Sequence, residues 1–465
     1  MYSFEFITAH HYTREIRDSR EEPFPRGRVV KIPAKTPNSG RKPTLDSLWF
    51  LLILLLASSP VVAQEKQYKG NLHTHSLWSD GDDYPEMIAK WYRDHGYSFL
   101  TFTDHNTLQA KERWTDVAKN KGGQTAYDKL KAAFPEWTDE RTTDGKLEVR
   151  LKKFTETRDR LEKPGEFLLM HGEEISDAFG NKPLHLNVSN IKELIPRMGG
   201  NSVLEVLQNN VSAAVSQRER TKQPMMIHVN HPNFGYAVTE RDLMQLIGER
   251  FFEVYNGHPS VNNAGDKTRP GTERMWDIIN AMRMGVLKLP VMYGIAVDDG
   301  HNYHQKVPGT ASQPGRGWVM VMADQLTPGS LIEAMESGRF YSSSGVSLSK
   351  VEATDQGLTL ELAKQQGTMF NVEFIGTLKK DLPKKQAVKE TDRNWNAGIG
   401  RVLATANMDG GTLTYNFTGD EVYIRARITS NRKHPNPGQP NELQRAWTQP
   451  VPGPAAVTFE ENEEE

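Results

Sequence analysis

Residues 71–83 read NLHTHSLWSDGDD, and they place two histidines, His73 and His75, one residue apart behind an apolar lead-in. Successive side chains of a strand alternate between its two faces, so both imidazoles point the same way and can bind one cation together. Asp80 follows in the loop and can reach the same cavity or a neighbouring ion. A histidine pair alone has little weight, since most such pairs bind nothing, so the rest of the chain must supply further ligands.

The composition narrows the choice of ligands and partners. The chain has 465 residues, enough for two or more domains with a large core. Its formal net charge of -2 gives no broad basic field, so an obligate nucleic-acid partner is not expected. Cysteine is absent, which excludes disulfides and thiolate metal sites and leaves His, Asp and Glu as the plausible metal ligands.

The amino-terminal region predicts export. The apolar run at residues 48–57, LWFLLILLLA, is short for a membrane span and suits a signal-peptide core, with basic residues before it and small residues after it. We therefore expect a signal peptide at residues 47–63 and a periplasmic, secreted or surface location; an uncleaved anchor is the alternative. No other membrane association is expected. Residues 1–46 are rich in Pro, Arg and Lys without periodicity, and we predict a disordered extension.

Apolar runs that end in polar residues recur along the chain. Residues 83–96 have helical spacing and end at a glycine, and the apolar run 97–103 after them predicts a strand that stops at Asp104 and His105. Further apolar runs lead into polar residues at 167–170, 225–229, 251–255 and 291–297, with helical stretches at 202–220 and 272–284. This alternation predicts parallel βα units. We expect a barrel rather than an open doubly wound sheet, because polar residues follow nearly every strand.

Two regions differ from this pattern. Residues 109–166 form a charged insertion in the hydrolase-like region 64–344, predicted to be helical and mostly solvated; it could cover the site or be a surface excursion. Thr327 and Pro328 predict the start of a helix that ends at Gly338. The alternating segments 358–362, 371–375 and 422–428 then predict a small antiparallel β-sandwich over residues 345–457, followed by an acidic tail at 458–465.

The polar residues at the strand ends are all oxygen or imidazole donors. The candidate metal ligands are His73, His75, Asp80, His105, Glu174, His185, His231, Asp299 and His301. A set of this size can hold more than one divalent ion, with a carboxylate such as Glu174 bridging. Several other side chains are better explained as structural or supporting: we expect a structural role for His95 and His171, a structural or supporting role for His228, and an orienting role for Asp104, Asp298, His258 and His304.

The motifs HTH with SDG, TDH, GEE with a later HLN, NHP and DGH follow one another from residue 71 to about residue 318. In this order they resemble the successive motifs of the PHP (polymerase and histidinol phosphatase) superfamily. The resemblance implies a distorted (βα)7 barrel with two or three divalent ions, commonly zinc, manganese or iron. It implies one ion held by His73, His75, Glu174 and Asp299, a second by Glu174, His185 and His231, and a third by Asp80, His105 and His301. Many members have histidine at the Asp80 position. We therefore expect aspartate at this position to weaken or change the binding of the third ion relative to those members.

These ligands predict a metal-dependent phosphoesterase for a small phosphorylated substrate, in which a metal-bound hydroxide attacks phosphorus. Glu174 and Asp299 would be central to catalysis, and Arg316 could contact the phosphate, although an ordinary surface arginine is the alternative. No residue is assigned as general acid. Two other functions stay open: hydrolysis of an amide or lactone by the same ions, and binding of a glycan or partner by the carboxyl-terminal domain through Trp447 and Tyr423, unless these aromatics are core residues.

Overall fold

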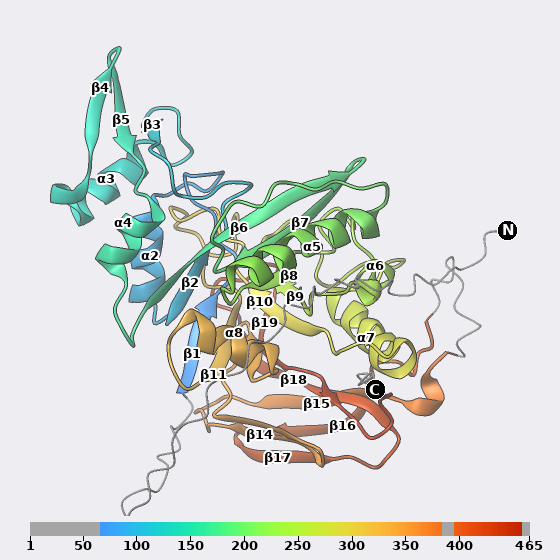
Figure 1. Ribbon diagram of the computed structural model, residues 1–465. Coiled ribbons are helices and arrows are strands. Elements are labelled where there is room, and N and C mark those ends of the chain that lie inside the picture. Colours follow the sequence, from blue (N-terminus) through green and yellow to red (C-terminus); the bar gives the residue numbers. More distant parts are fainter. Residues whose placement is uncertain (1–65, 384–394, 458–465) are drawn as a thin grey trace, which may run out of the picture. The chain divides into compact units, whose positions relative to one another are not determined.

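A 14-stranded mixed sheet organises the residues that the computed structural model describes, 66–383 and 395–457 (Figure 1). The predicted extension 1–46, the predicted signal segment 47–63 and the acidic tail 458–465 lie outside the described residues, as do residues 64 and 65 at the start of the predicted hydrolase-like region. The described part contains no helix long and apolar enough to cross a membrane. Export therefore stays a prediction.

The strands that precede the polar motifs lie in one half of the sheet. They are β1 (Lys66–Asn71), β2 (Phe99–Phe102), β6 (Leu168–Phe179), β7 (Lys182–Ser189), β8 (Met226–Val229), β9 (Phe251–Asn256), β10 (Tyr293–Val297) and β11 (Trp318–Ala323). Their spatial order is β10-β9-β8-β7-β6-β2-β1-β11. The pairs β1–β2, β2–β6, β8–β9 and β9–β10 are parallel, as the sequence predicted, whereas β7 runs antiparallel to both neighbours and β11 runs antiparallel to β1.

The chain beyond β10 returns to the end of β1, at the other side of this half-sheet. Thr74 forms a parallel bridge with Gly300, and the His75 amide donates to the Gly300 carbonyl over 3.0 Å. The polar residues after β1 and β10 therefore meet, although their strands are separated by five others in the sheet order. Closure at this point brings all the polar strand ends around one centre.

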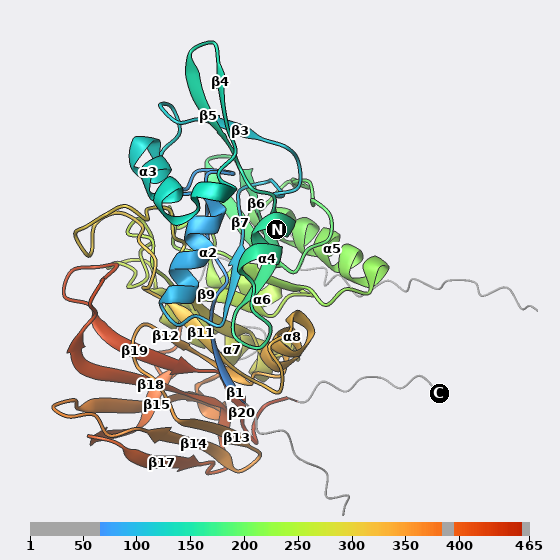
Figure 2. The same cartoon turned by 90° about the vertical axis from the view of Figure 1, so that its left-hand side faces the viewer.

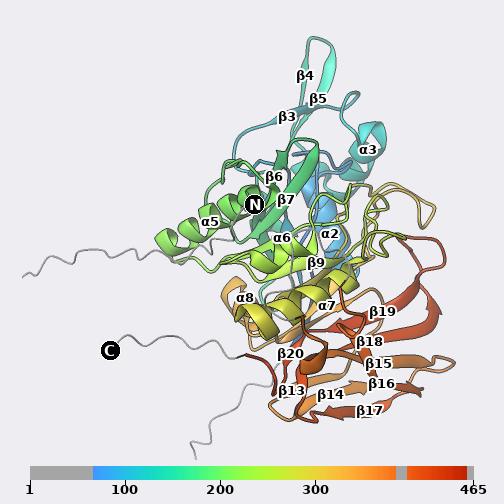
Figure 3. The same cartoon turned by 90° about the vertical axis from the view of Figure 1, so that its right-hand side faces the viewer.

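Helices cover the outer side of this half-sheet. The predicted ones appear as α2 (Pro85–Asp94), α5 (Val203–Thr221), α7 (Thr272–Met282) and α8 (Pro328–Glu336), together with the short α6 (Glu240–Gln245). Figure 3 shows α5, α6, α7 and α8 along one side of the strands. Two predicted helix boundaries are confirmed: Gly96 has a φ of 73° just after α2, and the Thr327 hydroxyl accepts a hydrogen bond from the Ser330 amide at the start of α8.

The insertion is not mainly helical, which corrects the prediction. It contains β3 (Trp114–Asp116), α3 (Gly123–Ala133), β4 (Glu140–Thr143), β5 (Lys146–Arg150) and α4 (Phe154–Leu161), and its strands pair in the order β3-β5-β4. In β5 the apolar Leu147 and Val149 alternate with charged residues, which is the pattern of a half-buried strand. The high charge of the insertion concealed this pattern in the sequence. Val149 packs with Leu77 and Trp78 of the loop after β1, while the β4 end of the hairpin projects outward (Figure 2).

The carboxyl-terminal strands form two layers, but one of them belongs to the large sheet. β12 (Phe340–Ser343) pairs with β19 (Leu443–Thr448), and the sheet continues through β18 (Glu421–Lys433) and β15 (Phe370–Leu378) to β16 (Arg401–Met408), with β20 (Val451–Pro452) also paired to β18. The second layer contains β13 (Lys350–Thr354), β14 (Gly357–Leu362) and β17 (Gly411–Asn416), of which β14 and β17 lie below β15 and β16 in Figure 1.

The separate β-sandwich expected after residue 344 is thus continuous with the first half of the chain. The alternation of β11 explains how one strand serves both halves. Val319 and Val321 lie in the main core, whereas Met320 and Met322 on the opposite face pack against the carboxyl-terminal core. The two aromatics considered for glycan or partner binding do not form a surface: Trp447 is 1% exposed and Tyr423 is fully buried, so that alternative is wrong for these residues.

Candidate metal centre

All nine candidate ligands lie together, and most of them lie just beyond the carboxyl ends of parallel strands. His73 and His75 follow β1, His105 follows β2, and His231 follows β8, while Asp299 and His301 follow β10; Glu174 and His185 lie within the long strands β6 and β7. Asp80 comes from the loop after His75. These residues form overlapping groups in which the ligand atoms lie within 4.8 Å of one another. The clustering expected from parallel strand ends is therefore present.

The first group contains His73, His75, Glu174 and Asp299. Oε2 of Glu174 lies 3.5 Å from Nε2 of His73 and 3.2 Å from Nε2 of His75. Oδ1 of Asp299 lies 3.3 Å and 3.2 Å from the same two nitrogens, which are 3.0 Å apart. Two carboxylate oxygens and two imidazole nitrogens thus converge on one point, the donor set that divalent transition metals bind.

The second group uses the other oxygen of the same glutamate. Oε1 of Glu174 lies 2.9 Å from Nδ1 of His185 and 3.5 Å from Nε2 of His231. The Asn230 amide donates to this oxygen over 2.8 Å and fixes the rotation of the carboxylate. Because its two oxygens face different groups, Glu174 has the orientation that a bridging ligand requires.

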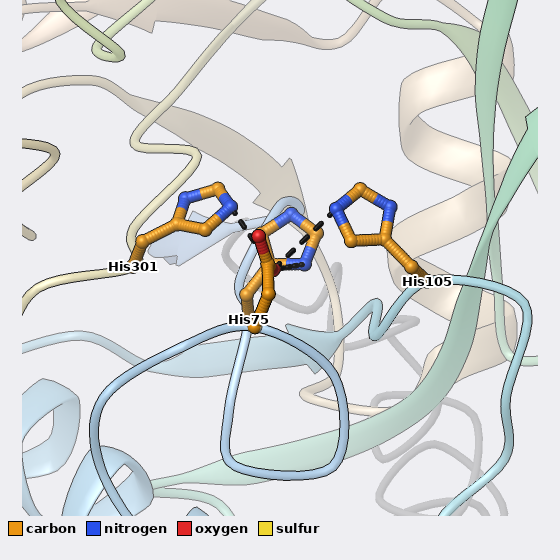
Figure 4. A group of neighbouring side chains, drawn as sticks. His75, His105 and His301 are labelled. Atoms are coloured by element: carbon orange, nitrogen blue, oxygen red, sulfur yellow. Dashed lines mark ion pairs between the residues drawn. The ribbon is translucent and has the colours of Figure 1, made fainter. Parts of the chain in front are cut away.

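The third group surrounds Asp80 and opens to solvent. Oδ1 of Asp80 lies 3.3 Å from Nε2 of His301, 3.5 Å from Nε2 of His105 and 3.7 Å from Nδ1 of His75. Figure 4 shows these three imidazoles directed toward a common centre. The Asp80 side chain is 40% exposed, whereas that of Glu174 is fully buried. This side of the cluster is the one that a substrate can approach.

The cluster contains polar atoms that the described residues leave without hydrogen-bond partners. They are Oδ1 of Asp80, Oε2 of Glu174 and Nδ1 of His185, which are buried and lie close to other atoms of the cluster without the geometry of a hydrogen bond. Buried carboxylate and imidazole atoms rarely stay unpaired, because each such atom loses its hydration without compensation. Three of the candidate ligands thus each present an uncommitted donor atom to the cluster, and the residues present fit divalent metal ions.

The charges of the cluster shift the pKa values strongly. Burial would raise the pKa of Glu174, but the charges of His105 and His185 outweigh it and hold this pKa well below its usual range. Burial would lower the pKa of His105, yet Glu174 raises it to about 9. Glu174 therefore favours a proton on the His105 imidazole, and a divalent cation bound beside this imidazole would displace that proton.

A further carboxylate of the cluster, Glu253, was not identified from the sequence. It lies in β9, fully buried, with Oε1 2.6 Å from Nδ1 of His73 and 3.3 Å from Nε2 of His228. Its Oε2 accepts from the His231 amide over 2.7 Å. The His73 contact fixes the imidazole orientation and directs Nε2 into the cluster, a common arrangement around metal-binding histidines. The signal was available: Glu253 is the one acidic residue in the buried strand FFEVYN.

Two other acidic residues order the loops that carry ligands. Asp104 accepts hydrogen bonds from the Ser76 amide over 2.8 Å and from the Ser79 hydroxyl over 2.6 Å, which shapes the turn between His75 and Asp80. Asp298 accepts from the amides of Gly315, Arg316 and Gly317. Asp299 has a φ of 50°, a strained backbone conformation for a non-glycine residue, and such strain often persists at functional sites.

Arg316 does not join the cluster. Its side chain is fully buried and donates from Nη1 to the Gly257 carbonyl over 2.7 Å, so it supports the loop after β9 instead of facing solvent. This position corrects both expectations for Arg316, as a phosphate contact and as a surface arginine. His95 and His171 also lie outside the cluster, stacked on Trp91 and Phe154 respectively. The His258 ring lies 5.5 Å from that of His301, at the edge of the cluster.

No protein-family model and no curated protein matched the chain. Among solved structures, it is similar to a two-domain protein from Bacteroides vulgatus that contains a predicted PHP-like metal-dependent phosphoesterase, with 15% identity and a TM-score of 0.37 over 84% of this chain and 97% of that one. A protein from Bifidobacterium adolescentis assigned as a metal-dependent phosphoesterase matches with 12% identity and a TM-score of 0.27 over 53% of this chain and 92% of that one. An amidohydrolase from Chromobacterium violaceum matches with 14% identity and a TM-score of 0.27 over 51% and 89%.

Proposed function

We propose that the chain is a metal-dependent hydrolase, and more narrowly a phosphoesterase that acts on a small phosphorylated substrate. The observation that supports this most is the position of Glu174, whose two oxygens face separate groups of imidazole ligands. Divalent ions bound by these groups would activate water and neutralise charge on a phosphate ester. The protein itself supplies the fixed ligands, the buried hydrogen bonds that orient them, and one side open to solvent beside Asp80.

The finer features of the proposal concern the ions and the fold around them. We propose two or three ions, zinc, manganese or iron, with the third held by Asp80, His105 and His301. We also propose that the first half of the sheet corresponds to a distorted (βα)7 barrel and that the protein is exported. The parallel strand pairs and the bridge from Thr74 to Gly300 support the barrel.

A substrate panel tests the proposed reaction. The metal-loaded protein is expected to release phosphate or an alcohol from phosphomonoesters or phosphodiesters, and the panel should include amides and lactones under the same conditions. Activity on amides or lactones alone would keep the metal centre and replace the phosphoesterase with the alternative hydrolase. No hydrolysis of any compound by protein of verified metal content would count against an enzymatic role.

The insertion places a positive charge at the open side of the cluster. Nζ of Lys121 lies 2.6 Å from the Asp80 carbonyl oxygen and 3.4 Å from its Oδ2. The insertion is anchored next to this point, because Lys129 pairs with Asp83 over 2.8 Å and the Trp78 indole donates to the Lys152 carbonyl. Lys121 is therefore held where the phosphate of an approaching substrate would meet it.

We predict that Lys121→Gln raises KM for a phosphomonoester about three- to tenfold and leaves kcat nearly unchanged, because an exposed lysine contributes mainly to binding of the phosphate. Steady-state kinetics on the best phosphomonoester of the panel measure this split. Lys119→Gln, an exposed lysine two residues away, is the matched control and should behave as wild type. A K121Q variant with an unchanged KM, or with an equal loss in the control, would remove Lys121 from substrate binding.

A further inference from the structure

A cavity separate from the candidate metal centre lies between α7 and the carboxyl-terminal strands. Its volume is about 650 Å³, and none of the nine candidate metal ligands lines it. One wall comes from the start of α7 with Thr272 and Asp277, and the facing wall comes from β15, β18 and β19. Cavities of this size accommodate small organic molecules.

Four arginines line this cavity: Arg274, Arg425, Arg427 and Arg445. Two of them are paired with acids. Arg425 binds Asp277 through Nε and Nη2, each over 2.8 Å, and Arg427 contacts Glu273 over 3.1 Å and Glu373 over 2.8 Å. These pairs join α7 to the sheet and engage Glu273 and Asp277. Glu442, a third acid of the lining, accepts hydrogen bonds from the Gly438 and Gln439 amides.

The arginines nevertheless retain donors that the described residues do not use. Nη1 of Arg425 and Nε of Arg445 are buried and have no hydrogen-bond partner there, and Arg425 as a whole is 1% exposed. Arg274 donates only to main-chain carbonyls, those of Ile399 and Asn396. A buried guanidinium donor without an acceptor is costly, because it loses hydration and gains nothing in return. The missing acceptors are supplied most directly by an anion inside the cavity.

The cavity also has apolar wall residues, which indicate that the anion has an apolar part as well. Trp447 and Tyr255 line it with almost fully buried rings whose centroids are 5.7 Å apart, and the more exposed Val402 and Leu443 add accessible apolar surface. An inorganic ion would fill a small part of this volume and leave the apolar walls unused. The combination of guanidinium donors and apolar walls suits an organic anion with an apolar body.

We propose that this cavity is a second binding site, distinct from the metal centre, for a small organic anion. Its carboxylate or phosphate ester group accepts hydrogen bonds from Arg445 and Arg425, and its apolar part lies against Val402 and Leu443. Arg425 also has a structural role through its pair with Asp277, so its substitution would affect folding as well as binding. Arg445 makes no ion pair with an acid within hydrogen-bond distance among the described residues. Substitution of Arg445 therefore tests ligand binding separately from folding. The proposal does not depend on the hydrolase activity.

Benzoate, which carries one carboxylate on an apolar ring, is the probe. Saturation-transfer NMR on the full-length metal-loaded protein is expected to detect benzoate binding, and Arg445→Gln should weaken it about tenfold or more, since a charge-assisted hydrogen bond is lost. Arg432→Gln is the matched control, because Arg432 is an exposed arginine of β18 whose side chain donates to the Gln366 carbonyl. This control should bind benzoate as wild type does.

A third variant separates the cavity from the metal centre. Glu174→Gln alters the metal ligands and should leave benzoate binding unchanged. Loss of the signal in E174Q would place the probe at the metal centre and overturn the proposal. An absent signal in wild type, or equal binding by R445Q and wild type, would also overturn it and leave the cavity as a solvent-filled gap. Thermal unfolding of each variant confirms that the compared proteins are folded.

Discussion

Replacing Glu174 by Gln is expected to lower kcat on the best phosphoester by a factor on the order of a thousand or more. Loss of a side chain that only orients a metal ligand typically reduces metal affinity or activity about 10- to 100-fold, and Glu174 contacts both ligand groups directly. Gln also replaces one of the two carboxylate oxygens by an NH2 group, which donates hydrogen bonds where the imidazoles require an acceptor. Initial rates at saturating substrate measure this effect.

Glu173 offers a matched control for this substitution. It is the adjacent, fully buried carboxylate, but it points to the opposite face of β6 and accepts from the Ile195 amide over 2.9 Å. Burial raises the pKa of Glu173 to about 7, so a neutral side chain is already close to its native state. We expect E173Q to retain most of the activity. An inactive E173Q beside an active E174Q would contradict the assignment of Glu174 as the bridging ligand.

Replacing Asp277 by Ala is expected to lower the free energy of unfolding by about 3–5 kcal/mol. The substitution leaves the guanidinium of Arg425 buried without its partner, and breaking a buried pair from one side typically has this effect. Asp277 also accepts a hydrogen bond from the Tyr423 hydroxyl over 2.9 Å. Urea unfolding monitored by tryptophan fluorescence measures the change.

Glu373→Ala is the control for this pair, because Glu373 and its partner Arg427 have side chains 20% and 30% exposed. Solvent screens such a contact, and we expect a loss of about 1 kcal/mol or less. Equal destabilisation by the two substitutions would show that the buried pair between α7 and β18 contributes no more to the free energy of unfolding than the partly exposed pair does. A much larger effect of D277A would support the tight coupling of the two halves of the sheet.

The clustering of the candidate metal ligands was predictable because their signals are local. The one-residue gap between His73 and His75 puts both imidazoles on one face of an extended segment, and the same gap recurs at Asp299 and His301. Helix signals were equally local, as the Thr327 cap shows. The choice between Glu173 and Glu174 came from the family resemblance, and the structure brings Glu174 into the cluster.

Features that depend on distant pairing were not predictable in the same way. A strand pattern carries no information on direction, so the antiparallel β7 and β11 were not foreseen. The continuity of the carboxyl-terminal strands depends on the pairing of β12 with β19, about one hundred residues apart. Arg316 was misjudged because its sequence neighbours do not show that two distant loops, one with Gly257 and one with Asn436, enclose it.

The central claim is that these residues bind divalent metal, and elemental analysis of the purified protein tests it most directly. Wild type, dialysed against metal-free buffer, is predicted to retain at least two transition-metal ions per chain, and E174Q is predicted to retain fewer. The hydrolytic rate of wild type should fall with its metal content on treatment with a chelator and return when metal is restored. A metal-free preparation that hydrolyses its substrate at the undiminished rate would contradict the claim.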